Sequence, residues 1–462
     1  MSTNQAYMNR TIDDNPAVQE PPVWRLLLNL AAPLMLSNLF QQLYSTVGAA
    51  FVGRYVGSQA LAAVGASGYI VLILIYFFIG LSVGASIAVS HAFGARSADG
   101  VHKAVHTTAA LSLLSGLLLT VAGIAFCPLF LRWMNVPADA LPYAETYLTI
   151  YFYSMIPMLI YNMGSGVLRA VGDTKTSMYC LAAACACNIA LTYLLVAVLA
   201  VGIAGAAWAT VVSQLLAAVI VTVRLMRSRD LYRLEWRSIK LHWSELEKIV
   251  QIGTPAGLQS VLQSFSNLFI QSKFNLFGSG IMAGVTAYCR VEGFIYMPIE
   301  GFAMAAAVLA GQSVGAGQYE RVRQVFASCA VLCTGVTAGI SFLVCWQAAA
   351  ILTLFTTDAA ALQVGLDMLY MLVPLYFIYG MNQVFGGVIR GTGQSRVPML
   401  IVMVCLCLFR VVWTMFAPLF SQEPWGIFIC YPLSWGLAWV AFALYYRYGG
   451  WLKKYETASM RA

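Results

Sequence analysis

Four ionisable side chains lie within long apolar runs in the second half of this 462-residue sequence. Glu292 and Glu300 are eight residues apart, which separates them by about 80° around an ideal helix. Arg290 lies close to the first glutamate, and Arg410 lies in the middle of another apolar run. Placing such a group in hydrocarbon costs about 2.5–3.5 kcal/mol on insertion scales, so each one is a functional candidate. Their chemistry is that of cation or proton binding.

We therefore predict a coupling site for a cation or a proton at Glu292, Glu300, Arg290 and Arg410. Loss of water favours the protonated acid, whereas a nearby guanidinium favours the carboxylate, and the balance decides between a proton carrier and a fixed charge. The alternative is a permanent structural ion pair between Arg410 and one of the two glutamates. Both interpretations require the apolar runs to bring these residues together.

The apolar runs predict helices that cross a membrane. Apolar residues make up 60% of the chain and charged residues only 10%, whereas soluble domains carry about 25% charged residues. Continuous runs such as 70–89 favour helices over the alternating strands of an outer-membrane barrel. We predict an all-α integral membrane protein with twelve transmembrane helices, at residues 24–53, 58–94, 101–132, 140–170, 174–200, 203–229, 245–278, 281–316, 319–355, 360–391, 395–421 and 425–450.

The basic residues predict how these helices are oriented. With a cytoplasmic N-terminus, 21 of the 26 lysines and arginines lie in cytoplasmic loops or tails. The positive-inside rule therefore predicts that both termini are cytoplasmic. We expect a multi-pass protein of the plasma (inner) membrane whose +8 charge contacts anionic lipid headgroups. Because the basic residues are spread over many loops, we expect no nucleic-acid partner.

The two halves of the sequence repeat each other at a nearly constant offset. Arg169 recurs as Arg390, and Pro33 recurs as Pro255. We predict two pseudo-symmetric six-helix lobes, at residues 23–229 and 245–450, with a linker at 230–244 and cytoplasmic tails at 1–22 and 451–462. Repeats of six helices enter the membrane in the same direction and enclose a central cavity, an arrangement typical of transporters.

Amide and aromatic side chains within the helices are our candidates for a substrate cavity. Amides recur every four residues from Gln259 to Asn275, and a shorter set lies in the first helix. The candidate cavity residues are Asn38, Gln41, Gln42, Gln259, Gln263, Asn267, Gln271, Tyr161, Tyr296 and Tyr379. The rings suit flat or cationic compounds through cation–π attraction. The alternative is ordinary packing, with the amides hydrogen-bonded to neighbouring helices.

Several segments of the sequence resemble the multidrug and toxic compound extrusion (MATE) family of secondary transporters. They lie at residues 33–57, 60–65 (ALAAVG), 93–95, 168–174 (LRAVGDT), 266–278, 296–298, 311–317 (GQSVGAG) and 389–393 (IRGTG). The resemblance implies a twelve-helix, two-lobe exporter that a sodium or proton gradient drives. Members commonly carry an aspartate in the first helix, at a position where this chain has Gly48.

We therefore expect a secondary active transporter that exchanges Na⁺ or H⁺ for small organic, cationic or lipophilic drug-like compounds by alternating access. Its partners would be the small-molecule substrate and membrane lipids, and we expect a functional monomer with no cofactor, metal site or ATPase subunit. The first alternative is a flippase for a lipid-linked precursor, which the scarcity of basic residues within helices disfavours. The remote alternative is a membrane-embedded enzyme, for which the sequence offers no catalytic His or Cys arrangement.

Overall fold

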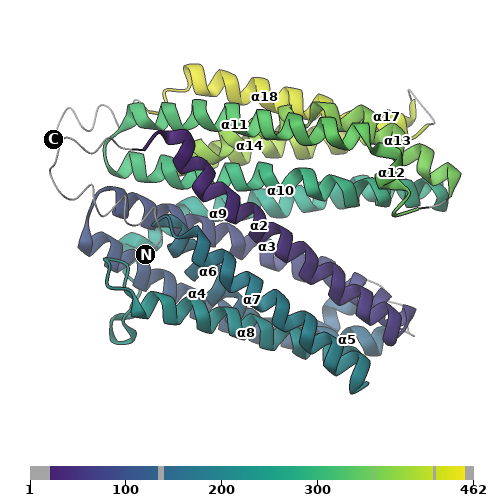
Figure 1. The fold of residues 1–462 in the computed structure, drawn as a ribbon, viewed down its shortest axis with the longest axis horizontal. Coiled ribbons are helices and arrows are strands. Elements are labelled where there is room, and N and C mark those ends of the chain that lie inside the picture. Colours follow the sequence, from purple (N-terminus) through teal and green to yellow (C-terminus); the bar gives the residue numbers. More distant parts are fainter. Residues whose placement is uncertain (1–20, 134–139, 357, 420–422, 453–462) are drawn as a thin grey trace. The chain divides into compact units, whose positions relative to one another are not determined.

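A computed structural model describes the chain at residues 21–133, 140–356, 358–419 and 423–452 (Figure 1). All regular elements in these ranges are helices, which confirms the all-α prediction. The predicted tails at 1–22 and 451–462 lie almost entirely outside the described residues.

The helices follow the predicted apolar runs closely. In the first half they are α2 (Val23–Tyr55), α3 (Ser58–Gly94), α4 (Ala98–Trp133), α5 (Leu141–Phe152), α6 (Met155–Ala170), α7 (Thr174–Thr192), which continues as the π-helix η1 (Tyr193–Val198), and α8 (Ile203–Arg227). In the second half they are α9 (Trp243–Phe274), α10 (Ser279–Gly315), α11 (Tyr319–Trp346), α12 (Ala348–Leu352), α13 (Ala359–Leu372), α14 (Tyr376–Gly391), α15 (Arg396–Val402), the π-helix η5 (Met403–Leu408), α16 (Phe409–Phe416), α17 (Trp425–Phe428) and α18 (Cys430–Tyr448).

Ten helical segments in the described part of the chain are long and apolar enough to cross a bilayer. The other two predicted spans are also helical, but each has a feature that keeps it out of this group. The span at 140–170 is interrupted at Tyr153 and Ser154, between α5 and α6. The span at 245–278 is α9, where the repeated amide side chains make the helix less apolar.

Contacts divide the chain into two compact units. Unit 1 comprises Leu36–Gly257, and unit 2 comprises residues 21–35 together with the described residues from Leu258 onward. The division therefore cuts two helices, because the first part of α2 belongs to unit 2 and the first part of α9 belongs to unit 1. Since α2 and α9 are equivalent in the repeat, the exchange of helix ends is reciprocal. The sequence alone does not predict that the first part of each of these helices belongs to the other unit.

Glycines on α3 and α10 allow the exchanged helix ends to pack closely. In unit 1, a β-carbon built on Gly80 of α3 would lie 2.2 Å from the Cα of Gly257 on α9. In unit 2, a β-carbon on Gly301 of α10 would lie 2.8 Å from the Cγ of Met35 on α2. Gly80 and Gly301 are equivalent positions of the repeat, as are Met35 and Gly257, so the same contact occurs once in each unit. Small residues at such crossings let helix backbones approach.

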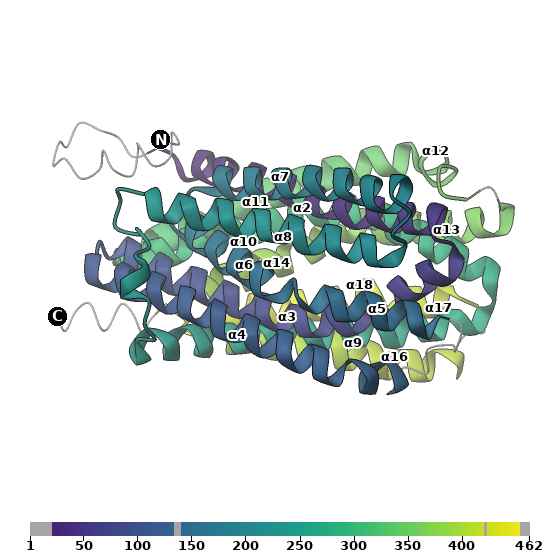
Figure 2. The same cartoon turned by 90° about the horizontal axis from the view of Figure 1, so that it is seen from below.

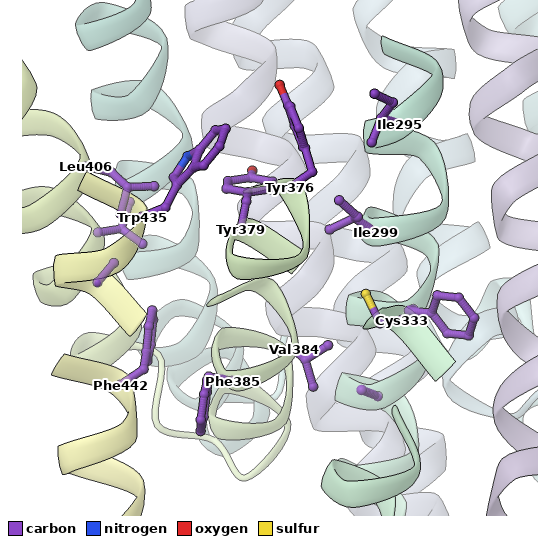
Figure 3. Packing of buried hydrophobic residues seen from close by; sticks show 14 of the residues in the cluster. Ile295, Ile299, Cys333, Tyr376, Tyr379, Val384, Phe385, Leu406, Trp435 and Phe442 are labelled. Carbon is purple, nitrogen blue, oxygen red and sulfur yellow. The ribbon is translucent and has the colours of Figure 1, made fainter. Parts of the chain in front are cut away.

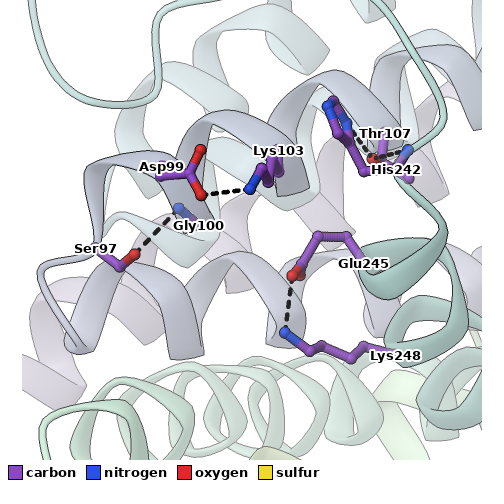
Figure 4. Close-up of polar contacts among 8 residues, drawn as sticks. All are labelled: Ser97, Asp99, Gly100, Lys103, Thr107, His242, Glu245 and Lys248. Atoms are coloured by element: carbon purple, nitrogen blue, oxygen red, sulfur yellow. Dashed lines mark hydrogen bonds and ion pairs between the residues drawn. The ribbon is translucent and has the colours of Figure 1, made fainter.

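Unit 1 is built around α6, which packs against α3, α4 and α8. Figure 2 shows α3 and α4 side by side in this unit. The segment that follows α8 is anchored to α4, because the backbone N–H of Glu235 donates to Nε2 of His106 at 3.0 Å. Next to it, the backbone N–H of His242 donates to the hydroxyl of Thr107 at 3.1 Å (Figure 4). The predicted linker at 230–244 is thus held against the helices of unit 1.

Unit 2 is built around α10 and α14 in the same way. α10 packs against α11, α13 and α14, and α14 also packs against α11 and α18 (Figure 1). Ile299, Tyr376 and Trp435 are fully buried in the shared core, where Figure 3 shows the two rings close together. A buried tyrosine brings a hydroxyl into the core, and that hydroxyl usually finds a hydrogen-bond partner. In unit 2 these partners lead to the predicted glutamates.

Candidate functional site

Glu292 of α10 lies in a group of buried tyrosine hydroxyls. Tyr376 of α14 donates a hydrogen bond to its Oε1, and Tyr288, one turn earlier in α10, donates to the same oxygen at 3.4 Å. The two tyrosine hydroxyls are 2.9 Å apart, and both residues are at most 2% exposed. Hydrogen bonds from hydroxyls satisfy part of the acceptor capacity of a carboxylate without neutralising its charge. Glu292 is therefore held between two helices by neutral donors.

Arg410 of α16 is buried near this group but is held by other residues. It is 3% exposed, and its Nε donates to the hydroxyl of Ser434 on α18 at 2.8 Å. Its guanidinium carbon lies 4.5 Å from the centre of the Tyr431 ring, a cation–π contact. Arg410 interacts electrostatically with Glu292, but the described ion pairs all lie elsewhere. The structural ion pair that was our alternative interpretation does not form among the described residues.

Glu300, two turns further along α10, has different surroundings. Its Oε1 accepts a hydrogen bond from Nε2 of Gln383 on α14 at 2.6 Å, and the same nitrogen lies 3.0 Å from the Tyr379 hydroxyl. The Glu300 residue is exposed, whereas Glu292 is half-buried. Arg390, in the last turn of α14, interacts electrostatically with Glu300 and donates to the Gln259 amide oxygen at 3.4 Å. A neutral amide, and not a cation, is thus the direct partner of Glu300.

An aromatic cluster of Tyr296, Tyr376, Tyr379 and Trp435 lies between the surroundings of the two glutamates. The Tyr296 ring meets the Tyr376 and Tyr379 rings edge-on, with centroids 5.6 and 4.9 Å apart. Trp435 lies 4.9 Å from the Tyr376 ring and 5.8 Å from the Tyr379 ring. Tyr376 contacts Glu292 through its hydroxyl, and Tyr379 contacts Gln383, the partner of Glu300. A single packed cluster therefore connects the two acids.

Arg290 does not join the other three predicted coupling residues. It is two residues from Glu292, which places the two side chains about 200° apart around the helix. Arg290 is exposed and lines a separate cavity with Thr286 and Phe355. The structure thus brings Glu292 and Arg410 into one neighbourhood and places Glu300 beside the connecting cluster, but it separates Arg290 from all of them.

The ten predicted cavity residues fall into two groups, and the cavity itself stays a prediction. In unit 1, Tyr161 is buried and donates weakly to the Ser177 carbonyl at 3.5 Å, whereas Gln41 and Gln42 are exposed and Asn38 is half-buried. In unit 2 the buried members are Gln259, which bonds Arg390, and Tyr379, and the more accessible ones are Gln263, Asn267, Gln271 and Tyr296. Gln271 donates to the amide oxygen of Asn275, the residue directly after the end of α9, at 3.3 Å. Ordinary packing with hydrogen bonds to neighbouring groups, our alternative to a substrate cavity, therefore fits the three buried residues, Tyr161, Gln259 and Tyr379.

Sequence reasoning did not connect any residue of α14 with the two glutamates, although Tyr379 was a candidate for the substrate cavity. Tyr376, Tyr379, Gln383 and Arg390 recur at intervals of three, four and seven residues, so they share one face of that helix. This spacing is a signal that the sequence offers. Arg390 lies near the end of the predicted helix 360–391, and in the structure it lies in the last turn of α14 and reaches the surroundings of Glu300.

Comparisons with known proteins agree with this architecture. The MatE family model matches the chain twice, at residues 33–194 and 255–416, so the two matches begin at Pro33 and Pro255, an equivalent pair of the repeat. The chain is 28% identical over 447 residues to the probable multidrug resistance protein YoeA of Bacillus subtilis (strain 168), covering 95% of this chain and 96% of that protein. It is 29% identical over 432 residues to the probable multidrug resistance protein YpnP of the same organism, covering 93% and 96%.

A solved structure of a MATE protein in the bent conformation has the same fold. It matches with a TM-score of 0.89 at 20% sequence identity, covering 99% of this chain and 100% of that one. The family resemblance, the fold class and the prediction that the chain is not an enzyme are thereby confirmed. The chain belongs to the MatE family, the multidrug and toxic compound extrusion transporters.

Proposed function

We propose that this transporter exports small organic, cationic or lipophilic drug-like compounds in exchange for Na⁺ or H⁺, by alternating access. The observation that carries the proposal is Glu300, an exposed carboxylate within an apolar helix, whose direct partner is the amide of Gln383. An amide can donate through its nitrogen or accept through its oxygen, so it can bond either the carboxylate or the protonated acid. Such a partner keeps the side chain in place while its charge changes.

Glu292 is the second acid of the proposal. Its bonds to Tyr376 connect α10 to α14, the two helices around which unit 2 is built. When Glu292 gains a proton, or when a bound Na⁺ offsets its charge, the Tyr376 and Tyr288 hydroxyls face a weaker acceptor, and the α10–α14 contact weakens. A charge-assisted hydrogen bond is about twice as strong as a neutral one. We infer that this difference links ion binding to the packing of unit 2.

We further propose that the transporter works as a monomer in the plasma membrane, with both termini in the cytoplasm. The cytoplasmic position of the termini is supported by the 21 of 26 basic residues that fall on one side of the predicted topology. Arg290 takes no part in the proposed coupling, because it lies on the other side of α10.

The proposed function is tested by gradient-driven transport in proteoliposomes. Purified protein is reconstituted, and uptake of a fluorescent lipophilic cation such as ethidium is followed under an imposed sodium gradient and then under a proton gradient. We expect Glu300→Gln to lower the gradient-driven rate by at least about tenfold, because the side chain keeps its shape but loses its titratable charge. Glu292→Gln should act in the same direction. The gradient that drives the wild type identifies the coupling ion.

Asp367→Asn provides the matched control. Asp367 is an exposed acid on α13 that accepts from Gln363 on its own helix at 2.9 Å, so its neutralisation should leave transport unchanged. Thermal unfolding of each variant separates lost coupling from lost folding. Undiminished transport by well-folded Glu300→Gln and Glu292→Gln would overturn the proposed site. If the wild type responded to neither gradient, the antiport proposal itself would fail for this substrate class.

A further inference from the structure

A second polar site lies on the side of α10 opposite Glu292. A cavity of about 450 Å³ lies between α10 and the segment that follows α12. Met282, Thr286 and Arg290 line it from α10, at intervals of four residues that place them on one face. Phe355 and Thr356 line it from the other side. All of these residues belong to unit 2.

The cavity contains a cation whose charge is not neutralised by a described carboxylate. Arg290 is exposed, and within the described ranges no carboxylate pairs with it. The nearby acid, Asp358, accepts bonds from the backbone N–H groups of Ala360 and Ala361 at 2.8 and 3.2 Å, where it caps α13. The Thr356 hydroxyl accepts from the Asp358 backbone N–H at 3.3 Å, which leaves its own hydrogen to donate. The cavity thus offers a guanidinium and a hydroxyl donor to an anion.

The length of α10 determines the depth at which Arg290 can lie. The helix has 37 residues and is therefore about 55 Å long, whereas the hydrocarbon core of a bilayer is about 30 Å thick. If the excess of about 25 Å is shared equally, about 12 Å of helix lies outside the core at each end. Arg290 is the twelfth residue, about 17 Å from the start, and its Cα lies only a few ångströms inside the core. A long arginine side chain reaches the headgroup layer from that depth.

We propose that this cavity binds the phosphate of an anionic phospholipid. The guanidinium of Arg290 presents a planar set of donors that matches two phosphate oxygens, and Thr356 adds a third donor. Met282 and Phe355 provide an apolar wall for the glycerol and the start of the acyl chains. A soluble anion would gain nothing from that wall. The bound lipid would connect the beginning of α10 to the segment between α12 and α13.

Lipid-dependent stability tests this site independently of transport. Purified protein is placed in nanodiscs of phosphatidylcholine alone or of phosphatidylcholine with phosphatidylglycerol, and thermal unfolding is measured. We expect phosphatidylglycerol to raise the Tm of the wild type by about 2 °C. Arg290→Gln should remove that increase, and Arg290→Lys should keep part of it, because lysine retains the charge but not the planar fork. Native mass spectrometry should show one fewer retained phosphatidylglycerol in Arg290→Gln.

Arg323→Gln is the control for general charge effects. Arg323 lies near the start of α11 and pairs with Glu320 at 3.1 Å, so its loss should not change the lipid-dependent shift. An equal shift in the wild type and in Arg290→Gln would overturn the proposal. So would reproduction of the shift by glycerol 1-phosphate added to phosphatidylcholine nanodiscs, because a soluble anion would then be the ligand. Loss of the shift in Arg323→Gln would assign it to surface charge and also overturn the site.

Discussion

Equivalent arginines of the two units are held in different ways. Arg390, at the end of α14 in unit 2, donates to Gln259 and interacts electrostatically with Glu300. Arg169, its equivalent at the end of α6 in unit 1, has a buried Nε without a hydrogen-bond partner in the described structure. At the same offset, the residue of unit 1 that corresponds to Glu300 is Ile79. The repeat thus contains two arginines, but among the residues that the structure describes only the arginine of unit 2 has an acid of this kind nearby.

At one pair of equivalent helix ends, unit 1 has an acid where unit 2 has a neutral amide. In unit 1, Asp173 caps α7 and pairs with Arg224 on α8 at 3.1 Å. The equivalent residue of unit 2 is Gln394, which accepts from the Tyr445 hydroxyl at 2.7 Å and donates to the Trp451 carbonyl at 2.7 Å. At this pair of equivalent positions, unit 1 thus uses an acid to hold two helix ends together, whereas unit 2 uses a neutral amide. The two candidate acids of unit 2, Glu292 and Glu300, lie within the span. An acid that holds an end needs a constant charge, whereas an acid within the span is useful when its charge changes.

The largest expected effect on stability is that of Asp173→Ala. Asp173 is 2% exposed, so its removal breaks an ion pair and an N-cap, which together should lower the free energy of unfolding by about 3 kcal/mol. Asp173→Asn should lower it less, because asparagine caps a helix as well as aspartate does. The measurement is reversible unfolding of the purified protein by SDS in mixed micelles.

Gln394→Ala is the matched variant in unit 2. It removes two neutral hydrogen bonds, so we expect a loss of about 1.5 kcal/mol. If Gln394→Ala were as destabilising as Asp173→Ala, the proposed difference between the helix ends would be wrong.

Tyr376→Phe should destabilise the protein less than Asp173→Ala and about as much as Gln394→Ala. The hydroxyl of Tyr376 bonds both Glu292 and Tyr288, so its removal should lower the free energy of unfolding by about 1.5 kcal/mol and reduce gradient-driven transport. The matched variant is Tyr161→Phe in unit 1, whose hydroxyl makes a long bond of 3.5 Å to the Ser177 carbonyl. That variant should lose about 0.5 kcal/mol and keep its transport rate. Equal transport losses in the two variants would show that the tyrosines of unit 2 are not specific to coupling.

Local patterns were sufficient to predict the helices and the two candidate acids. Apolar runs determine where membrane helices form, and glutamates within such runs are recognisable because burial of a charge is costly. The nearly constant offset between matching residues, such as Pro33 and Pro255, also predicts the repeat that the family model confirms. These features can be read from the chain without knowing which helices pack together.

The partners of the acids could not be predicted because they depend on distant contacts. Tyr376 lies 84 residues from Glu292, and Gln383 lies 83 residues from Glu300. The exchange of helix ends likewise depends on close contacts at Gly80 and Gly301 that no local pattern indicates. The separation of Arg290 from Glu292 is different, since their spacing of two residues already predicts opposite sides of a helix.

The smallest effect is expected from Arg169→Gln, which tests directly whether the equivalent arginines Arg169 and Arg390 are held in different ways. Because the buried Nε of Arg169 has no partner among the described residues, replacing it with a neutral side chain removes an unsatisfied group. We expect the free energy of unfolding to stay the same or to rise by up to about 1 kcal/mol. Arg390→Gln should instead lower it by about 1 kcal/mol, because Gln259 loses its donor and Glu300 loses a nearby positive charge. SDS unfolding of the two variants gives both values. A loss in Arg169→Gln that matched the loss in Arg390→Gln would mean that Arg169 has a counter-charge of its own, and the two units would then hold their arginines in the same way.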